Sequence, residues 1–459
     1  MTPISTVAES ASLDEVLHQA RAEFERCRPK SRTAFEVAAC HMPGGNTRTV
    51  LFHGPFPLRI EAGEGARIRD VDGHEYVNLL GEYTAGIFGH SNAIIRQAIV
   101  DALERGINLS GHTRAETEFA NLIRQRFPSI DLIRFTNSGT EANLMAITAA
   151  RFATGRQKVM VFSGGYHGGL LYFGGGGSPV NAPFPYLVSR YNDIDAASAM
   201  LREHGSDIAC VVVEPMIGSG GCIPGRPEFL RMLRQETRSA GAVLIFDEVM
   251  TSRLSYGGAQ ELFSITPDLT TLGKYLGGGM SFGAFGGASR LMQVFDPRAD
   301  SHLPHAGTFN NNVVTMAAGK AALTHVLTRS ALDALNARGD ALRKRLNARF
   351  EAAGVRLRAT GVGSLLNIHA VASDVRYPDE LATSDDRIKE LLFLDLLERG
   401  YYIARRGFIA LSLEVTDLDL DGFESGVASF VEAYRRLISV DPVVRRPAGH
   451  AATTLTCVN

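Results

Sequence analysis

Lys274 is the residue of this sequence best suited to covalent chemistry. It closes a Thr-rich apolar run that begins after Asp268, and the three glycines Gly277, Gly278 and Gly279 follow it. A lysine at the end of a buried strand can lose its proton and attack an aldehyde to form a Schiff base. Most lysines are solvated surface charges, so this interpretation depends on the residues that accompany Lys274.

A possible phosphate-binding turn precedes it in the chain. Ser138, Gly139 and Thr140 lie between an apolar strand and the start of a helix. Backbone N–H groups at a helix start, together with two hydroxyls, can bind an anion such as a phosphate. The alternative is a plain helix cap with Glu141 in the first turn.

Two carboxylates follow apolar strands. Asp247 comes after residues 242–246, and Glu214 comes after residues 210–213. A carboxylate at this edge of an open α/β sheet can keep the pyridine nitrogen of pyridoxal 5'-phosphate (PLP) protonated, which makes the ring a better electron sink. The alternative for Asp247 is a buried cap of the next helix. Glu214 is interpreted as an acid that either organises its loop or bonds to residues of the site without contacting the ligand itself.

The loop at residues 162–169 adds an aromatic side chain and a histidine. Tyr166 could stack on a flat cofactor ring, and His167 is either a hydrogen-bonded loop residue or a direct participant. His167 has no second ligand at metal-binding spacing, so we expect no metal site. Each of these features follows a predicted strand, so they can meet at one sheet edge: the phosphate turn, the loop with Tyr166, Asp247 and Lys274. Together they predict a PLP site.

Composition excludes several other classes of protein. The 459 residues are 45% hydrophobic and 21% charged, with a net charge of -2, as in an ordinary globular protein. This charge favours neither nucleic acid nor an anionic membrane as a partner. No stretch has the apolar length of a signal peptide or a transmembrane helix. Five widely spaced cysteines favour a reduced, cytoplasmic protein over a disulfide framework.

The pattern of elements that must position these residues is an alternation of helices and short apolar strands between residues 90 and 330. Runs buried on both faces are typical of parallel strands, so an α/β fold with a mostly parallel sheet is expected. The clearest predicted strands are residues 132–135, 158–162, 208–213, 243–246 and 269–272. The clearest predicted helices are residues 12–40, 141–154, 227–240, 329–353 and 421–437.

We predict four regions along the chain. Residues 76–330 form a large PLP-binding domain, and residues 331–440 form a smaller α+β domain. Residues 1–75 are an N-terminal segment that joins the small domain. The tail at 441–459 has two prolines, a basic pair and small residues, so disorder is expected there.

The sequence resembles the class III (ω-type) PLP-dependent aminotransferases of fold type I over nearly its whole length. The matching stretches are residues 136–142, 165–168, 246–251, 270–279 and 307–310. The resemblance implies that Lys274 forms the internal aldimine, that Asp247 pairs with the pyridine nitrogen, and that Tyr166 and Val249 cover the two ring faces. It places Ser138, Gly139 and Thr140 at the phosphate. It also implies a homodimer with shared active sites, in which Thr308 reaches the phosphate of the partner subunit.

Within this class the chain is similar to two branches. Residues 256–260 match the glutamate-1-semialdehyde 2,1-aminomutases, whereas residues 81–86, 280–286 and 307–312 match the β-amino acid (β-phenylalanine-type) aminotransferases. Arg406 favours the second branch, because a guanidinium fork suits a substrate carboxylate. Arg48 aligns with another carboxylate-binding arginine of that branch. The alternative for both arginines is a surface ion pair.

The resulting hypothesis is a ping-pong transamination from an aromatic or aliphatic β-amino acid to a 2-keto acid such as 2-oxoglutarate or pyruvate. The freed Lys274 amine would carry the proton, and Tyr83 and Val50 would line the side-chain pocket. The alternatives are the aminomutase, which is an isomerase, and a non-catalytic protein of the same fold. The sequence leaves open the donor, the acceptor, the enantiomer and any assembly beyond a dimer.

Overall fold

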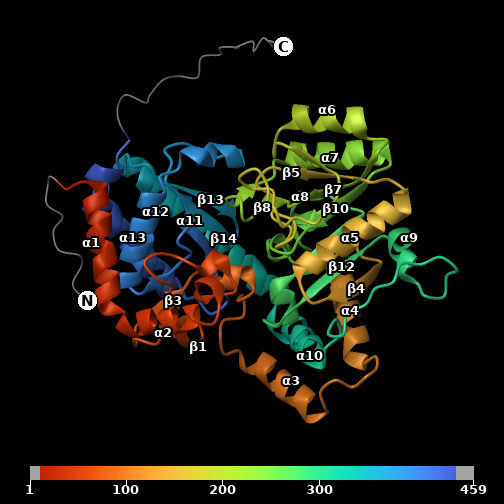
Figure 1. Ribbon diagram of the computed structural model, residues 1–459, viewed down its shortest axis with the longest axis horizontal. Coiled ribbons are helices and arrows are strands. Elements are labelled where there is room, and N and C mark those ends of the chain that lie inside the picture. The colour runs from red at the N-terminus through yellow and green to blue at the C-terminus, as the bar shows by residue number, and fades with distance from the viewer. Residues whose placement is uncertain (1–10, 441–459) are drawn as a thin grey trace, which may run out of the picture.

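The computed structural model describes residues 11–440, so the expected disorder of residues 441–459 lies outside it. Figure 1 shows two lobes side by side. One lobe combines the N-terminal and C-terminal elements, drawn in red and blue, and the other contains the middle of the chain. Within residues 11–440, no helix has the length and apolar character needed to cross a membrane.

A seven-stranded sheet forms the centre of the middle lobe. Its order is β4-β12-β11-β10-β7-β5-β6, and all neighbours pair in parallel except β12, which is antiparallel to both β11 and β4. The strands are β4 (Leu132–Thr136), β5 (Lys158–Phe162), β6 (Tyr186–Ser189), β7 (Ile208–Val213), β10 (Val243–Asp247), β11 (Leu269–Gly273) and β12 (Gly283–Gly287). The five predicted strands are confirmed to within one residue. The strands β6 and β12 were not predicted.

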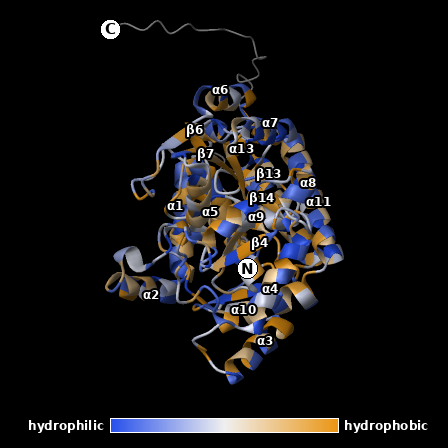
Figure 2. Cartoon of the chain, turned by 90° about the vertical axis from the view of Figure 1, so that its right-hand side faces the viewer, coloured by the Kyte–Doolittle hydropathy of each residue, from blue (hydrophilic) through white to orange (hydrophobic). Residues whose placement is uncertain are grey.

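Helices cover both faces of this sheet. Val212 and Ile245 pack in the same apolar cluster as α5 (Gly139–Thr154). Their neighbours Val211 and Leu244 belong to a second cluster with α6 (Ile194–His204) and α7 (Pro227–Ala240). Alternate side chains of one strand therefore meet opposite helix layers, which explains the continuous apolar runs. Figure 2 shows blue, hydrophilic residues on α7, which lies at the outside of the molecule.

The N-terminal region contains two helices where one was predicted over residues 12–40. These are α1 (Leu13–Cys27) and α2 (Pro29–Ala39). Arg28 has φ -128° and ψ 52°, and Pro29 is the first residue of α2. The prediction of a single helix was wrong because proline lacks the N–H that would continue the first helix and restricts the residue before it.

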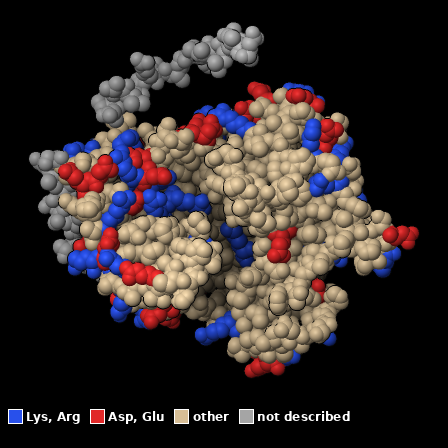
Figure 3. Space-filling view, viewed as in Figure 1, with Lys and Arg blue, Asp and Glu red and all other residues tan. Residues whose placement is uncertain are grey.

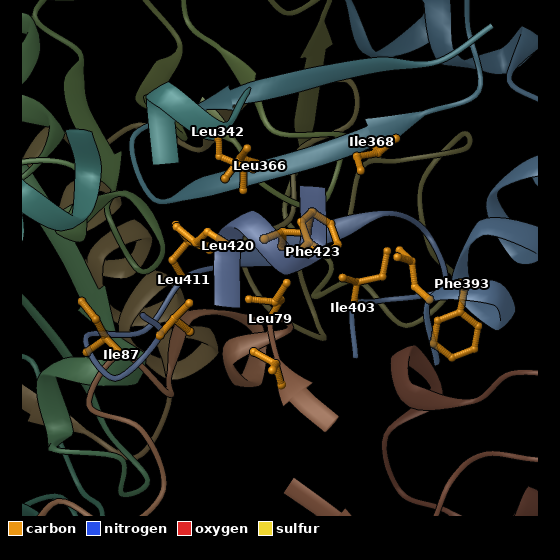
Figure 4. Packing of buried hydrophobic residues seen from close by; sticks show 14 of the residues in the cluster. Leu79, Ile87, Leu342, Leu366, Ile368, Phe393, Ile403, Leu411, Leu420 and Phe423 are labelled. Carbon is orange, nitrogen blue, oxygen red and sulfur yellow. The ribbon is translucent and has the colours of Figure 1, made fainter. Parts of the chain in front are cut away.

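The two ends of the chain share one sheet and one core. Strand β15 (Tyr401–Tyr402) pairs in parallel with β3 (Glu75–Asn78), in a four-stranded sheet with β1 (Ile60–Glu64) and β2 (Arg67–Asp70). In Figure 4, Leu79 from the N-terminal side lies near Leu411 and Ile403 from the C-terminal side. The proposed domain divisions remain a prediction, but this packing ties residues near 79 to the C-terminal elements.

The remaining elements complete the two lobes. The other strands are β8 (Met216–Ile217), β9 (Ile223–Pro224), β13 (Arg358–Val362), β14 (Leu365–His369) and β16 (Phe408–Ala410). The other helices are α3 (Ala93–Glu104), α4 (Arg114–Arg126), α8 (Ala259–Phe263), α9 (Ser289–Met292), α10 (Val313–Ala321), α11 (Arg329–Ala353), α12 (Asp386–Glu398) and α13 (Asp417–Ile438).

Candidate active site

Lys274 lies directly after β11, in a short turn with a strained backbone. Its φ is +54°, a left-handed value that is uncommon for a residue other than glycine. Its Nζ donates to the backbone oxygen of Tyr83 at 2.6 Å. Burial lowers the pKa of Lys274 to about 8, while the nearby Asp247 carboxylate acts in the opposite direction. About a tenth of this amine is therefore uncharged and nucleophilic at pH 7, far more than of an ordinary lysine.

Asp247 ends β10, the strand next to β11. The two strands are parallel and pair Asp247 with Thr271, so Asp247 and Lys274 lie at the same sheet edge. Asp247 is 3% exposed. Its Oδ2 accepts from His167 Nδ1 at 2.7 Å and from Asn143 Nδ2 at 2.9 Å, and its Oδ1 accepts from the N–H of Val249 at 3.0 Å. Three donors thus fix the orientation of this carboxylate.

His167 and Glu214 are also buried beside Asp247. Burial alone would lower the pKa of His167, but the hydrogen bond and the charge of Asp247 raise it above its ordinary value. Burial raises the pKa of Glu214 to about 7. Glu214 accepts from the N–H groups of Tyr166 and Gly218, each at 2.9 Å. It therefore connects the loop that carries Tyr166, a residue that is 42% exposed, to the segment after β7.

The predicted phosphate turn begins α5. Ser138 caps this helix, because its Oγ accepts from the N–H of Glu141 at 3.2 Å. A Cβ added at Gly139 would come within 2.8 Å of Val249, so only glycine fits there without movement. Thr140 Oγ1 accepts from the N–H of Gly169 at 3.2 Å. The turn is thus both a helix cap and a narrow cradle of N–H groups and hydroxyls next to Asp247 and Val249, which suits a phosphate attached to a flat ring.

Two residues of this network were missed in the sequence. Asn143, 1% exposed, donates to Asp247, and Thr271 Oγ1 donates to Asn143 Oδ1 at 2.8 Å. Both lie inside regular elements; Thr271 falls within the family-matching stretch 270–279, but nothing in that stretch points to a partner on another element. A buried asparagine one turn after the phosphate turn was the available signal. Polar residues on the inner face of a helix usually have a specific bonding partner.

Arg406 lies over two aromatic rings at the other end of the site. Its guanidinium carbon is 5.1 Å from the ring centre of Tyr83 and 5.8 Å from that of Phe408, and the two rings stack at 5.4 Å. Its Nη1 donates to Ser219 Oγ at 3.1 Å. No carboxylate of residues 11–440 forms an ion pair with Arg406, so its charge remains available to a substrate carboxylate.

Arg48 has a different environment. It forms an ion pair with Glu82, and both side chains are about half exposed. Val50 is 47% exposed, and its backbone oxygen accepts from the Tyr83 hydroxyl at 3.1 Å. In this structure Arg48 therefore forms a surface ion pair, which was the alternative to a carboxylate-binding role. Tyr83 connects this region to Lys274, since its backbone oxygen contacts Nζ.

Thr308 lies away from these contacts, in an exposed segment. It lines a hollow of about 1070 Å³ together with Asn137, Met280 and Phe309. Asn137 directly precedes the phosphate turn. Figure 3 shows a separate deep hollow between the two lobes, with lysine or arginine side chains inside it.

Comparisons with known proteins identify the family. Residues 52–407 match the model of the class-III aminotransferases. The chain belongs to this family. It is 53% identical over 428 residues to the β-phenylalanine transaminase of Variovorax paradoxus, a match covering 93% of this chain and 98% of that protein. It is 37% identical to the glutamate-1-semialdehyde 2,1-aminomutase of Thermodesulfovibrio yellowstonii, covering 85% of this chain and 96% of that protein.

Solved structures agree with this assignment. A β-phenylalanine aminotransferase from Variovorax paradoxus superposes with a TM-score of 0.92 at 52% identity, covering 93% of this chain and 99% of that one. The predicted family, the fold type I architecture and the PLP cofactor are confirmed. The chain is a PLP-dependent aminotransferase. The roles of its individual site residues remain predictions.

Proposed function

We propose that this aminotransferase moves the amino group of an aromatic or aliphatic β-amino acid to a 2-keto acid such as 2-oxoglutarate or pyruvate. The observation that carries the proposal is Arg406, which forms no ion pair within residues 11–440 and is held by Ser219 above the Tyr83 and Phe408 rings. A guanidinium on an aromatic platform can bind a carboxylate while the rings accommodate an apolar side chain. The 53% identity to a β-phenylalanine transaminase supports the same substrate class.

The residues around Lys274 and Asp247, which form the lysine end of the site, would hold the cofactor and use it. When bound, PLP supplies an electron-withdrawing ring that stabilises negative charge on the carbon next to the reacting amine. Asp247 would face the ring nitrogen, Tyr166 and Val249 would cover the ring, and Ser138, Gly139 and Thr140 would hold the phosphate. His167 would support Asp247, and Glu214 would support the Tyr166 loop.

Lys274 would act as both nucleophile and proton carrier. With a pKa of about 8, Nζ can accept a proton from the substrate carbon and return it near neutral pH. The backbone oxygen of Tyr83, 2.6 Å from Nζ, would orient the amine between transfers. A 2-keto acid would receive the amino group in the second half of the cycle.

The substrate residues Arg48 and Val50 belong to the same proposal. Arg48 would bind the second carboxylate of a dicarboxylic acceptor, and Val50 and Tyr83 would contact the donor side chain. Because Glu82 pairs with Arg48, a carboxylate that binds there must share or replace this partner. Exposed pairs contribute only about 0–1 kcal/mol, so the replacement costs little.

We further propose a homodimer with shared active sites. Ile107 is 61% exposed, Leu109 51% and Phe309 58%, and all three line the hollow that contains Thr308. Such a group of exposed apolar side chains is typical of an association surface. Docking of a second copy there would bring Thr308 to the phosphate of the partner subunit. Free cysteines, including the buried Cys210 and Cys222, support a cytoplasmic location.

Product analysis tests the substrate assignment. The purified enzyme with 3-amino-3-phenylpropionate and 2-oxoglutarate should form glutamate, and the Lys274→Ala variant should form none while still binding PLP at the phosphate turn. Production of 5-aminolevulinate from glutamate 1-semialdehyde, without glutamate from the first pair, would instead assign the chain to the aminomutases. Sedimentation of the holoenzyme, compared with a Phe309→Asp variant, tests the dimer.

A further inference from the structure

Asn143 is a buried amide in which the oxygen and both N–H groups each have a hydrogen-bonding partner. Its Oδ1 accepts from Thr271 Oγ1 at 2.8 Å, and its Nδ2 donates to Asp247 Oδ2 at 2.9 Å and to the backbone oxygen of His167 at 3.0 Å. These bonds join α5, β10, β11 and the loop after β5. A fully satisfied polar group of this kind fixes its neighbours, because any rotation leaves a buried atom without a partner.

The acceptors around Asn143 determine which way its amide faces, and Thr271 supplies the donor for its oxygen. The Asp247 carboxylate and the His167 backbone oxygen can only accept, so the NH2 group is directed at them and Oδ1 at the Thr271 hydroxyl. If the amide were rotated by half a turn, its oxygen would face that carboxylate and its NH2 group would lose the His167 acceptor. Thr271 is fully buried, so water cannot replace its hydroxyl easily. Without the Thr271 hydroxyl, Asn143 Oδ1 would be a buried acceptor with no donor, so the position of the amide depends on Thr271.

The acceptor sites of Asp247 can then be counted. An ionised carboxylate offers about four lone-pair positions. Asn143 and His167 occupy both positions of Oδ2, and the N–H of Val249 occupies one of Oδ1. One position remains, on Oδ1.

We propose that Asn143, held in place by its bond from Thr271, is a positioning residue that leaves Asp247 a single acceptor site for the ring nitrogen of PLP. The inference rests on the proposed role of Asp247. Without Asn143 or its correct orientation, Oδ2 regains a free position and the carboxylate can turn. The ring nitrogen would then lose a fixed partner, although PLP would still be held at its phosphate.

The neighbouring Thr270 provides a matched control. It is also fully buried, but its Oγ1 contacts Ser129 Oγ at 2.8 Å and Gln260 Nε2 at 3.3 Å, on the other face of β11. Thr270→Val and Thr271→Val each remove one buried hydroxyl from the same strand at nearly constant volume. Only Thr271→Val disturbs Asn143. Both variants should lose a similar amount of thermal stability.

The test is a pH titration of the visible absorbance of the bound cofactor, which reports the electrostatic environment of the ring rather than turnover. We expect Thr271→Val and Asn143→Leu to move the midpoint by about half a pH unit or more. Thr271→Ser should restore the wild-type midpoint, and Thr270→Val should not change it. If Asn143→Leu does not fold, the three threonine variants suffice.

A second readout needs no cofactor. In the PLP-free protein, the Nδ1 proton of His167, which donates to Asp247, should shift its NMR resonance in Thr271→Val and stay unchanged in Thr270→Val. Equal behaviour of the two valine variants in both measurements would overturn the inference. The Asp247→Asn variant distinguishes a failure of the Asn143 hypothesis from a failure of the proposed role of Asp247. If it moves the absorbance midpoint and Thr271→Val does not, only this inference fails; if neither does, the proposed role of Asp247 fails as well.

Discussion

The lysine end and the arginine end of this site differ in how much water reaches them. At the lysine end Asp247, His167 and Asn143 are at most 3% exposed and bond to one another. At the arginine end Arg48 and Glu82 are 46% and 50% exposed and bond mainly to each other. Buried networks hold one geometry, whereas exposed pairs rearrange at little cost. The proposed cofactor contacts are thus held in one geometry, and the proposed substrate contacts are adjustable.

The largest effect should follow from removing the charge at the lysine end. Asp247→Asn is expected to lower kcat at least about 100-fold, a loss typical of a preorganised electrostatic group. Glu248→Gln is the matched control, since the adjacent Glu248 is equally buried but accepts from the N–H groups of Ala259 and Gln260 at the start of α8. It should reduce stability by about 1–3 kcal/mol and change kcat much less. Similar kcat losses in both variants would remove the distinction between the two carboxylates.

Arg406 should have the next largest effect. Arg406→Leu is expected to raise KM for 2-oxoglutarate by roughly 10- to 150-fold, because a charge-assisted hydrogen bond contributes about 1.5–3 kcal/mol. Arg405→Leu is the control: Arg405 pairs with Glu390, which is 3% exposed, and does not contact Tyr83 or Ser219. The KM of the Arg405→Leu variant for 2-oxoglutarate should stay near the wild-type value, while the melting temperature of the variant falls. A KM that rises equally in both variants would place the carboxylate elsewhere.

A smaller, pH-dependent effect is expected from Lys274. Below its pKa of about 8 the amine is mostly protonated, so the rate at which PLP-free protein captures PLP should rise about fivefold from pH 7 to pH 8 and level off above about pH 9. The unfolded chain keeps its lysine proton until about pH 10.4, so stability of the PLP-free protein should rise with pH between these two values. Stopped-flow absorbance and thermal melts measure both. A Lys274→Met variant should lose both dependences, and their persistence in it would assign them to another group.

The smallest effect belongs to Glu82 at the arginine end. Glu82→Gln removes the ion-pair partner of Arg48, and an exposed pair contributes only about 0.2–1 kcal/mol. KM for 2-oxoglutarate should therefore fall by less than about fivefold, and KM for pyruvate, which has one carboxylate, should not change. Raising the salt concentration should reduce the difference between wild type and variant. A large drop in kcat would mean that Glu82 supports Lys274 through Tyr83 instead.

The parallel strands could be predicted because their information is local. The strand β7 is apolar at every position and is followed by Glu214, and β10 is apolar up to its last residue, Asp247. The strand β12 could not be predicted, because three of its five residues are glycines, which carry no apolar pattern. Its glycines are explained only by packing: a Cβ at Gly283 would collide with the backbone oxygen of Ser138. The antiparallel strand thus fits between β11 and β4 beside the phosphate turn.

The sequence by itself determined the family, the fold, the cofactor and the order of the candidate residues, because strand ends, glycine turns and Lys274 are recognisable from their neighbours in the chain. The tertiary structure alone brought Thr271, Asn143 and Asp247 together, and it alone gave Arg48 a carboxylate partner while Arg406 pairs with no carboxylate of residues 11–440. Thr271 and Asn143 are 128 positions apart, and Asn143 and Asp247 are 104 apart. Hydrogen bonds over such separations depend on how helices and strands pack, which no local pattern encodes.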